Sequence, residues 1–173
     1  MTRSLVFGLA LALALGCSSE SKAPQDSDAA APLFAPEDVA SLPLVRACRA
    51  PGEHSGLDGF TVRISQGAEA PLAELFEDPP GVAALPAGAL VVKELFASPD
   101  CAPGTLTRYT AMRKEPGFAP ESGDWHWQEL SPEGRVLIDG AVAACIDCHR
   151  GGASGSCAGF GEAAGRDWFC TAP

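Results

Sequence analysis

The chain has 173 residues and a formal net charge of −10, with 12 Lys and Arg residues against 22 Asp and Glu residues. The basic residues do not cluster, which makes nucleic acid and anionic lipid surfaces poor partners for the folded part. The length suits one domain with a real hydrophobic core, and the composition favours a small molecule or a redox protein as the partner.

Residues 1–16 have the features of a lipoprotein export signal. Arg3 supplies a positive charge, and an apolar run follows from Leu5 to Leu15 that is too short to span a bilayer. The run ends in Leu13-Ala14-Leu15-Gly16-Cys17, which resembles the bacterial lipobox. We therefore predict that Cys17 is acylated and that the protein is exported and held at the periplasmic face of the bacterial cell envelope, touching the membrane only through this lipid. The alternative is a plain cleaved signal peptide.

Residues 17–36 are poor in large apolar side chains and rich in Ser, Ala, Asp and Pro. Such a segment cannot bury enough surface to offset its chain entropy, and it predicts a flexible tether. Residues 37–173 form the remaining domain.

The domain has the pattern of a strand-rich protein. Short helices are expected over 36–46 and 71–76, and strands over 59–65, 88–96, 105–112 and 125–130, where β-branched or alternating residues lie between Pro and Gly clusters. The predicted fold class is α+β, mainly antiparallel sheet with short helices, followed by a C-terminal helix that carries a cysteine motif.

That motif is Cys145-Ile146-Asp147-Cys148-His149, the C-x-x-C-H arrangement of c-type haem attachment. Residues three and four positions apart lie on one face of a helix, so two thioether sulfurs and one imidazole can meet one porphyrin. The sequence therefore predicts haem c, with Cys145 and Cys148 as attachment points and His149 as the iron ligand. Export agrees with this, because c-type haem is attached outside the cytoplasm.

Three other interpretations compete with haem. A disulfide within one helical turn would be strained and would leave His149 unexplained. A structural zinc site would take Cys145 and Cys148 with two of Cys157, Cys170 and His149, but the second pair lacks the usual close spacing. A thioredoxin-like pair lacks the strand and the βαβ pattern expected around it.

The supply of further axial ligands is short. Apart from His149 the histidines are His54 and His126, and after signal removal the methionine is Met112. No Met or His follows the motif, where a small helical cytochrome would place its second ligand. We therefore expect five-coordinate iron with an open site for a small molecule, with Met112 or His126 as a sixth ligand in the alternative.

Several segments, in this order, resemble the cytochrome P-460 family over residues 59–171. They are Gly88 to Leu95 with its V-K-E-L run, Tyr109 with Met112 to Lys114, Gly123-Asp124-Trp125, Cys145 to His149, and Asp167 to Thr171. The C-x-x-C-H motif alone is common among cytochromes, whereas its combination with V-K-E-L and G-D-W is more specific.

The resemblance implies a dimeric antiparallel β-sheet protein with a high-spin c-type haem that oxidises hydroxylamine or a related small nitrogen compound. It also implies that Lys93 is cross-linked to the porphyrin. Close relatives without the cross-link bind nitric oxide or other diatomic gases, and this non-catalytic role is the second hypothesis. An electron-transfer cytochrome is the third.

Two positions need separate comment, the one that corresponds to the family's distal arginine and Lys93. The family's distal-pocket arginine falls best on Phe60, and Arg63 would lie on the opposite face of the same strand, which makes it a weak distal candidate. Lys93 shares a face of its predicted strand with Ala89, Val91 and Leu95, an apolar set. A lysine there snorkels to water, pairs with an acid, or is consumed by the cross-link.

The remaining cysteines are predicted to form disulfides. The Gly-rich segment that contains Cys157 is longer than in the family, and Cys170 stands where the family tends to have Phe, so the two are expected to pair. The second expected pair is Cys48 with Cys101. The alternative is that these are buried thiols.

Overall fold

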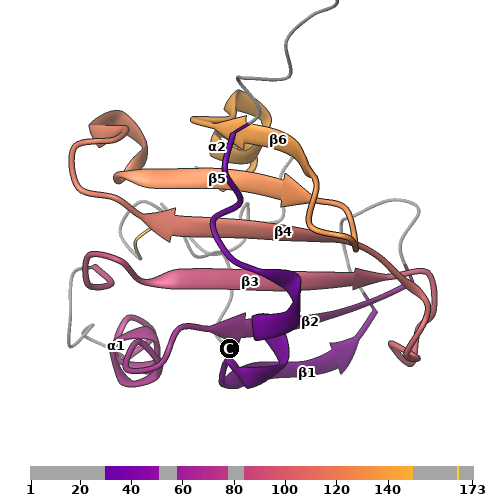
Figure 1. The fold of residues 1–173 in the computed structure, drawn as a ribbon. Coiled ribbons are helices and arrows are strands. Elements are labelled where there is room, and N and C mark those ends of the chain that lie inside the picture. The colour runs from indigo at the N-terminus through magenta and orange to yellow at the C-terminus, as the bar shows by residue number, and fades with distance from the viewer. Residues whose placement is uncertain (1–29, 51–57, 78–83, 150–166, 168–173) are drawn as a thin grey trace, which may run out of the picture.

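The computed structural model describes residues 30–50, 58–77, 84–149 and 167. The elements are η1 (Pro36–Ser41), β1 (Leu44–Arg49), β2 (Gly59–Ile64), α1 (Glu69–Glu74), β3 (Leu90–Phe96), β4 (Leu106–Lys114), η2 (Pro120–Ser122), β5 (Trp125–Leu130), β6 (Val136–Gly140) and α2 (Ala143–His149). The strands form one six-stranded antiparallel sheet in the order β1-β2-β3-β4-β5-β6 (Figure 1). Each strand therefore pairs with its neighbours in the sequence.

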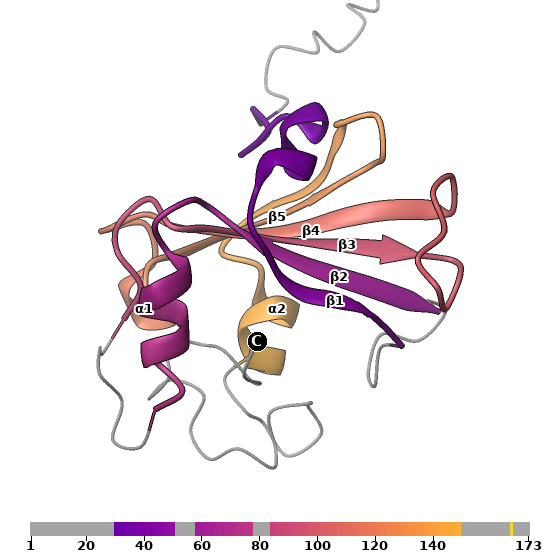
Figure 2. The ribbon, with the colours of Figure 1, turned by 90° about the horizontal axis from the view of Figure 1, so that it is seen from below.

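The two faces of the sheet are covered by different elements. In Figure 2 the helices α1 and α2 lie on one side of the sheet, and the indigo segment that contains η1 lies on the other. We call these sides the α face and the η face. Because directly paired residues share a face, the register assigns each side chain. The α face carries Ile64, Val91, Met112 and Trp127, and the η face carries Arg63, Val92, Ala111 and Gln128.

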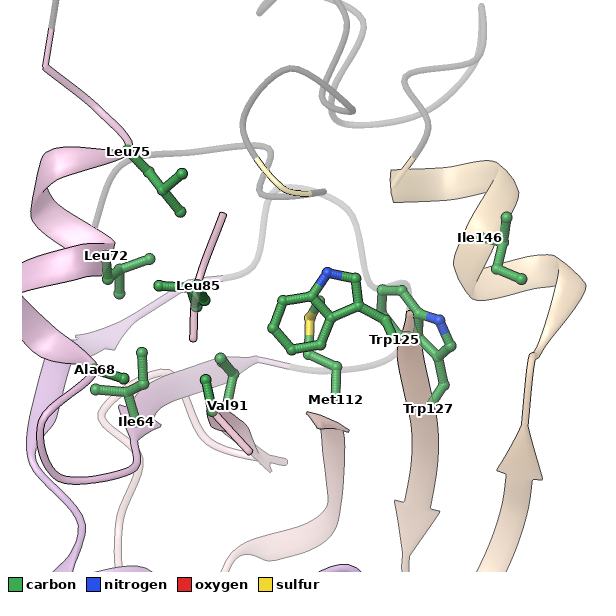
Figure 3. Packing of buried hydrophobic residues seen from close by; sticks show 11 residues of the cluster. Ile64, Ala68, Leu72, Leu75, Leu85, Val91, Met112, Trp125, Trp127 and Ile146 are labelled. Carbon is green, nitrogen blue, oxygen red and sulfur yellow. The ribbon is translucent and has the colours of Figure 1, made fainter. Parts of the chain in front are cut away.

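The larger hydrophobic cluster lies on the α face. Figure 3 shows Leu72 and Leu75 on one side of it, Ile146 of α2 on the other, and the two tryptophans of β5 between them. Trp125 is fully buried and Trp127 is 5% exposed. Burial of these two indole rings stabilises the cluster, at roughly 25 cal/mol per Å² of apolar surface removed from water. The cluster positions α2 against the sheet.

A second cluster lies on the η face. Val39 of η1 packs against Val92, Tyr109 and Leu130, with Phe34 edge-on to the Tyr109 ring at a centroid distance of 5.6 Å. The segment that follows the predicted tether therefore covers the face opposite α2.

The predicted α+β class and antiparallel sheet are confirmed, as are the strands expected near 59–65, 88–96, 105–112 and 125–130. The helix expected over 36–46 is wrong in its second half, because it ends at Ser41 and β1 begins at Leu44. Strand β6 was not predicted, and the helix that carries the motif begins at Ala143. Both β1 and β6 are edge strands with mostly exposed side chains, so neither shows a clear alternation of buried and exposed residues.

The predicted disulfide between Cys48 and Cys101 is present and joins β1 to the turn between β3 and β4. The chain at Gly59 passes close to this turn, where a Cβ would clash with the carbonyl oxygen of Ser98. The predictions for Cys17, residues 17–29, Cys157 and Cys170 lie outside the described residues. Among the helices of the described part, none is long and apolar enough to cross a membrane.

Candidate functional site

Helix α2 carries the cysteine motif and is tied to the sheet at both its start and its middle. The chain leaves β6 through Gly140, whose φ of 112° is a conformation that favours glycine. The Val142 amide then donates to the Gly140 carbonyl at 3.1 Å, and the Ile146 amide donates to the Val142 carbonyl at 3.0 Å. Ile146 is the buried residue of α2, so the helix presents the positions around it to the α face.

Cys145 packs against the α-face cluster next to Ile146. Cys145 and Cys148 are both half-buried and are not joined to each other, in contrast to the Cys48 and Cys101 pair. Burial raises the pKa of the Cys145 thiol, and the nearby Cys148 and Glu129 add to this effect. A redox-active pair needs a lowered thiol pKa, so the environment of Cys145 argues against the thioredoxin-like alternative.

His149 lies at the end of α2 over strand β5. Its ring meets the Trp127 ring edge-on, with a centroid distance of 4.6 Å and an interplanar angle of 64°. The indole Nε1 of Trp127 is buried and has no hydrogen-bond partner within the described ranges. The motif thus places an imidazole against a large apolar surface that holds one spare donor.

The α face itself has an apolar half and a polar half. The apolar half contains Ile64, Val91, Met112, Trp125 and Trp127. The polar half contains Lys93, Arg108, Thr110 and Glu129, which the register places on neighbouring strands: Lys93 opposite Thr110, and Thr110 opposite Glu129. Cys145 lies near the polar half through Glu129, and His149 lies over the apolar half through Trp127.

Lys93 lies on the α face, on the same side of the sheet as the motif. It pairs with Val62 on β2, and its Nζ lies 4.2 Å from the centroid of the Phe60 ring. The next residue, Glu94, points to the η face, where its Oε2 accepts from Thr61 Oγ1 at 2.6 Å and Arg63 Nε at 2.9 Å. Lys93 and Phe60 are therefore in contact with each other, and both lie on the side of the sheet that α2 covers.

Arg63 is not brought to this site. Its guanidinium pairs with Glu94 on the η face and donates to the Leu42 carbonyl at 2.9 Å. The sequence placed Arg63 on the face opposite Phe60, and the register agrees. The interactions of Arg63 explain its position structurally, as a link between the sheet and the segment after η1.

The two alternative sixth ligands lie on different faces. Met112 is 5% exposed on the α face, directly opposite Trp127 in the register. His126 lies on the η face, with Nδ1 at 3.2 Å from a Glu115 oxygen and Nε2 at 2.9 Å from an Asp139 oxygen. Met112 is thus on the motif side of the sheet and His126 is not. His54 lies outside the described residues.

Two groups on the α face were missed by sequence reasoning. Arg108 and Glu129 form an ion pair in the polar half, and the alternation of the strands over 105–112 and 125–130 could have revealed both. Lys114 and Asp167 form a second, buried pair at the far end of the same face. This pairing joins residues 53 positions apart, and no local pattern predicts it.

No group of three or more His, Cys, Asp or Glu side chains that could hold a metal ion occurs among the described residues. The zinc alternative also invoked Cys157 and Cys170, which fall outside those ranges. No family model matches the chain, and no curated protein shows significant similarity to it.

Proposed function

We propose that the chain is an exported cytochrome that carries one covalently attached haem c and oxidises hydroxylamine or a related small nitrogen compound at an open iron site. The observation that carries the proposal is the position of the C-x-x-C-H motif. It occupies one short helix that faces a large, mostly apolar sheet surface with Lys93 on it.

The residues present fit a haem. Cys145 and Cys148 would form the thioether bonds and His149 would bind the iron. Beside the motif the α face is apolar, and the buried Nε1–H of Trp127, which has no hydrogen-bond partner among the described residues, could donate to a polar atom of a bound group. When bound, the haem supplies a reversible one-electron change and an iron position for a small molecule.

The side chains of the α face would then set the surroundings of that position. Met112 and Trp127 exclude water from the apolar half, and Lys93 supplies a primary amine that the P-460 resemblance assigns to a bond with the ring. Electrons from substrate oxidation would pass to a redox partner protein, and the resemblance further implies a homodimer.

The first test is the absorption spectrum of the purified protein, oxidised and reduced, followed by hydroxylamine turnover with an artificial electron acceptor. The Cys145→Ala/Cys148→Ala variant is expected to lose covalent haem and turnover. The Cys157→Ala/Cys170→Ala variant serves as the control that keeps the motif. A protein purified from a host competent for haem attachment, yet lacking haem, would contradict the proposal.

Ferric iron with His149 as its single protein ligand is expected to give a high-spin electron paramagnetic resonance signal. A low-spin signal that becomes high-spin in the Met112→Leu variant would instead support an electron-transfer cytochrome. Met112 is the variant of choice because it lies on the motif side of the sheet.

The second candidate function is non-catalytic binding of nitric oxide or carbon monoxide. It is favoured by Phe60, an apolar residue at the position where the family resemblance expects an arginine, with Lys93 Nζ over its ring. A cation over an aromatic face is a stable arrangement for a lysine that has not reacted. Mass spectrometry of a tryptic digest decides between the two functions. A peptide containing Lys93 that is joined through haem to the Cys145 peptide supports the oxidase. A peptide that ends at an unmodified Lys93 supports gas binding.

The proposed location is the periplasmic face of the cell envelope, with an acyl anchor at Cys17. The Cys48 and Cys101 disulfide supports export, because such bonds persist in oxidising compartments. The Cys17→Ala variant is expected to move from the membrane fraction to the soluble fraction. If the unmodified protein and Cys17→Ala divide equally between the two fractions, Cys17 does not carry a lipid anchor.

A further inference from the structure

Arg108 stands out on the α face because its hydrogen-bonding capacity is largely unused. It lies on β4, opposite Leu95 and two residues before Thr110, so its side chain belongs to the polar half of the α face. Its described contact with a carboxylate is to Glu129, at 3.4 Å from Nη1 to Oε1. That distance is long for a charge-assisted hydrogen bond.

The Nε atom of Arg108 is buried and has no hydrogen-bond partner among the residues that the structure describes. A guanidinium offers five N–H groups in a planar fork, and a buried donor that is left unsatisfied lowers the stability of the folded state. The fork matches two oxygens of one carboxylate or oxyanion better than any other common acceptor. An anion that meets Nε and Nη would remove the cost.

The surroundings of Arg108 also favour an anion. Lys93 lies on the next strand, diagonally opposite on the same face, at a separation of about 7–8 Å for such neighbours. The polar half thus holds two cations and one carboxylate, Glu129. Its net charge is positive although the chain as a whole carries −10.

We propose that Arg108 is an anion-binding residue of the haem-side face and recognises a carboxylate or small oxyanion through its Nε and Nη groups. The inference rests on the proposed function, because its two sources are a propionate of the bound haem and a dissolved nitrogen oxyanion such as nitrite. Glu129 holds the guanidinium in place and competes with the incoming anion for it.

The test compares Arg108→Gln with Arg113→Gln in the haem-loaded protein. Arg113 is the matched control because it lies on the same strand but pairs with Glu115 and points to the η face. Covalent haem content is measured first in the unmodified protein. Its absence there would defeat the proposed function, and only a haem-loaded protein tests Arg108.

Two readouts separate the two sources. If the anion is dissolved, Arg108→Gln weakens spectrally detected nitrite binding about tenfold or more, the usual loss for one charge-assisted hydrogen bond, and Arg113→Gln does not. If the anion is a propionate, Arg108→Gln shifts the propionate bending band in the resonance Raman spectrum, and nitrite affinity stays the same. The inference is overturned when neither readout distinguishes Arg108→Gln from Arg113→Gln.

A Glu129→Gln variant covers the case in which Arg108→Gln fails to retain haem. Removal of the competing carboxylate is expected to act in the opposite direction, tightening nitrite binding about tenfold or moving the propionate band. If Glu129→Gln leaves both nitrite affinity and the propionate band unchanged, Arg108 does not bind an anion.

Discussion

Two ion pairs lie on the α face of the sheet, and they differ in how completely their groups are satisfied. The Lys114 and Asp167 side chains are 11% and 4% exposed and are in direct contact. The Arg108 and Glu129 side chains are 37% and 19% exposed and meet only at 3.4 Å. The first pair is largely buried with its charged groups in direct contact, and the second is partly exposed with its charged groups farther apart.

The groups around Asp167 form a complete network. One carboxylate oxygen accepts from Lys114, and the other accepts from the Leu85 amide at 2.8 Å. The Asp167 carbonyl accepts from Trp125 Nε1 at 3.1 Å, and Lys114 Nζ lies 4.9 Å from the centroid of a Trp125 ring. Such a network fixes residue 167 to the sheet and uses both carboxylate oxygens of Asp167, whereas the Arg108 guanidinium keeps donors to offer.

The comparison predicts its largest effect for Lys114→Met. This change leaves the Asp167 carboxylate buried without its counter-charge, and breaking a buried pair in this way costs about 3–5 kcal/mol of unfolding free energy. Urea unfolding followed by tryptophan fluorescence measures it. The double variant Lys114→Met/Asp167→Asn is expected to recover part of the loss, and a cost below about 1 kcal/mol for Lys114→Met would show that the pair is not a structural one.

A smaller effect is expected for Trp125→Phe, which removes the hydrogen bond from the indole to the Asp167 carbonyl. Trp127→Phe is the matched control, because its Nε1 has no partner within the described residues, so the change removes packing and an unpaired donor but no hydrogen bond. Trp125→Phe should therefore lose at least about 1 kcal/mol more than the control, the usual net value of one hydrogen bond. Equal losses in the two variants would mean that the bond to Asp167 contributes nothing.

A pH effect follows from the same carboxylate. Burial raises the pKa of Asp167, and the contacts with Lys114 and Leu85 oppose this without cancelling it. The folded state therefore holds this proton more tightly than the unfolded chain does. The resulting stability is fully present below the ordinary Asp pKa of about 4 and is lost as the pH rises through the folded-state pKa.

The measurement is the difference in unfolding free energy between the unmodified protein and Asp167→Asn over a pH series that starts near 4. The unfolding free energy of the unmodified protein is expected to fall relative to that of Asp167→Asn as the pH rises. A rise relative to Asp167→Asn would mean that the folded state prefers ionised Asp167, held by Lys114.

The smallest effect on stability is predicted for Glu129→Gln. The Arg108 side chain is more than one-third exposed, and solvent screens such a pair so that it contributes about 0–1 kcal/mol. Unfolding of this variant should therefore differ from the unmodified protein by less than about 1 kcal/mol. A loss as large as that of Lys114→Met would show that the two pairs have the same structural role.

The sequence alone predicted the features that depend on local patterns. Alternation over GFTVRIS placed Phe60 and Arg63 on opposite faces, and the strand around Lys93 put that residue and Glu94 on opposite sides, as the register has them. It did not predict β6, whose Leu137 and Ile138 are both exposed and so carry no alternation of burial. Nor did it predict the contact of Asp167 with Lys114, because a contact between residues far apart in the chain produces no local sequence pattern.

The disulfide between Cys48 and Cys101 has a consequence for how the chain matures. One cysteine pair must be oxidised to join β1 to the turn between β3 and β4, while Cys145 must remain a thiol if it is to bond a vinyl group. On the proposed function both events occur in the same compartment. The chain would then need an oxidant for one pair and a reductant for the other, and a strain that lacks the reductant should accumulate folded, colourless protein.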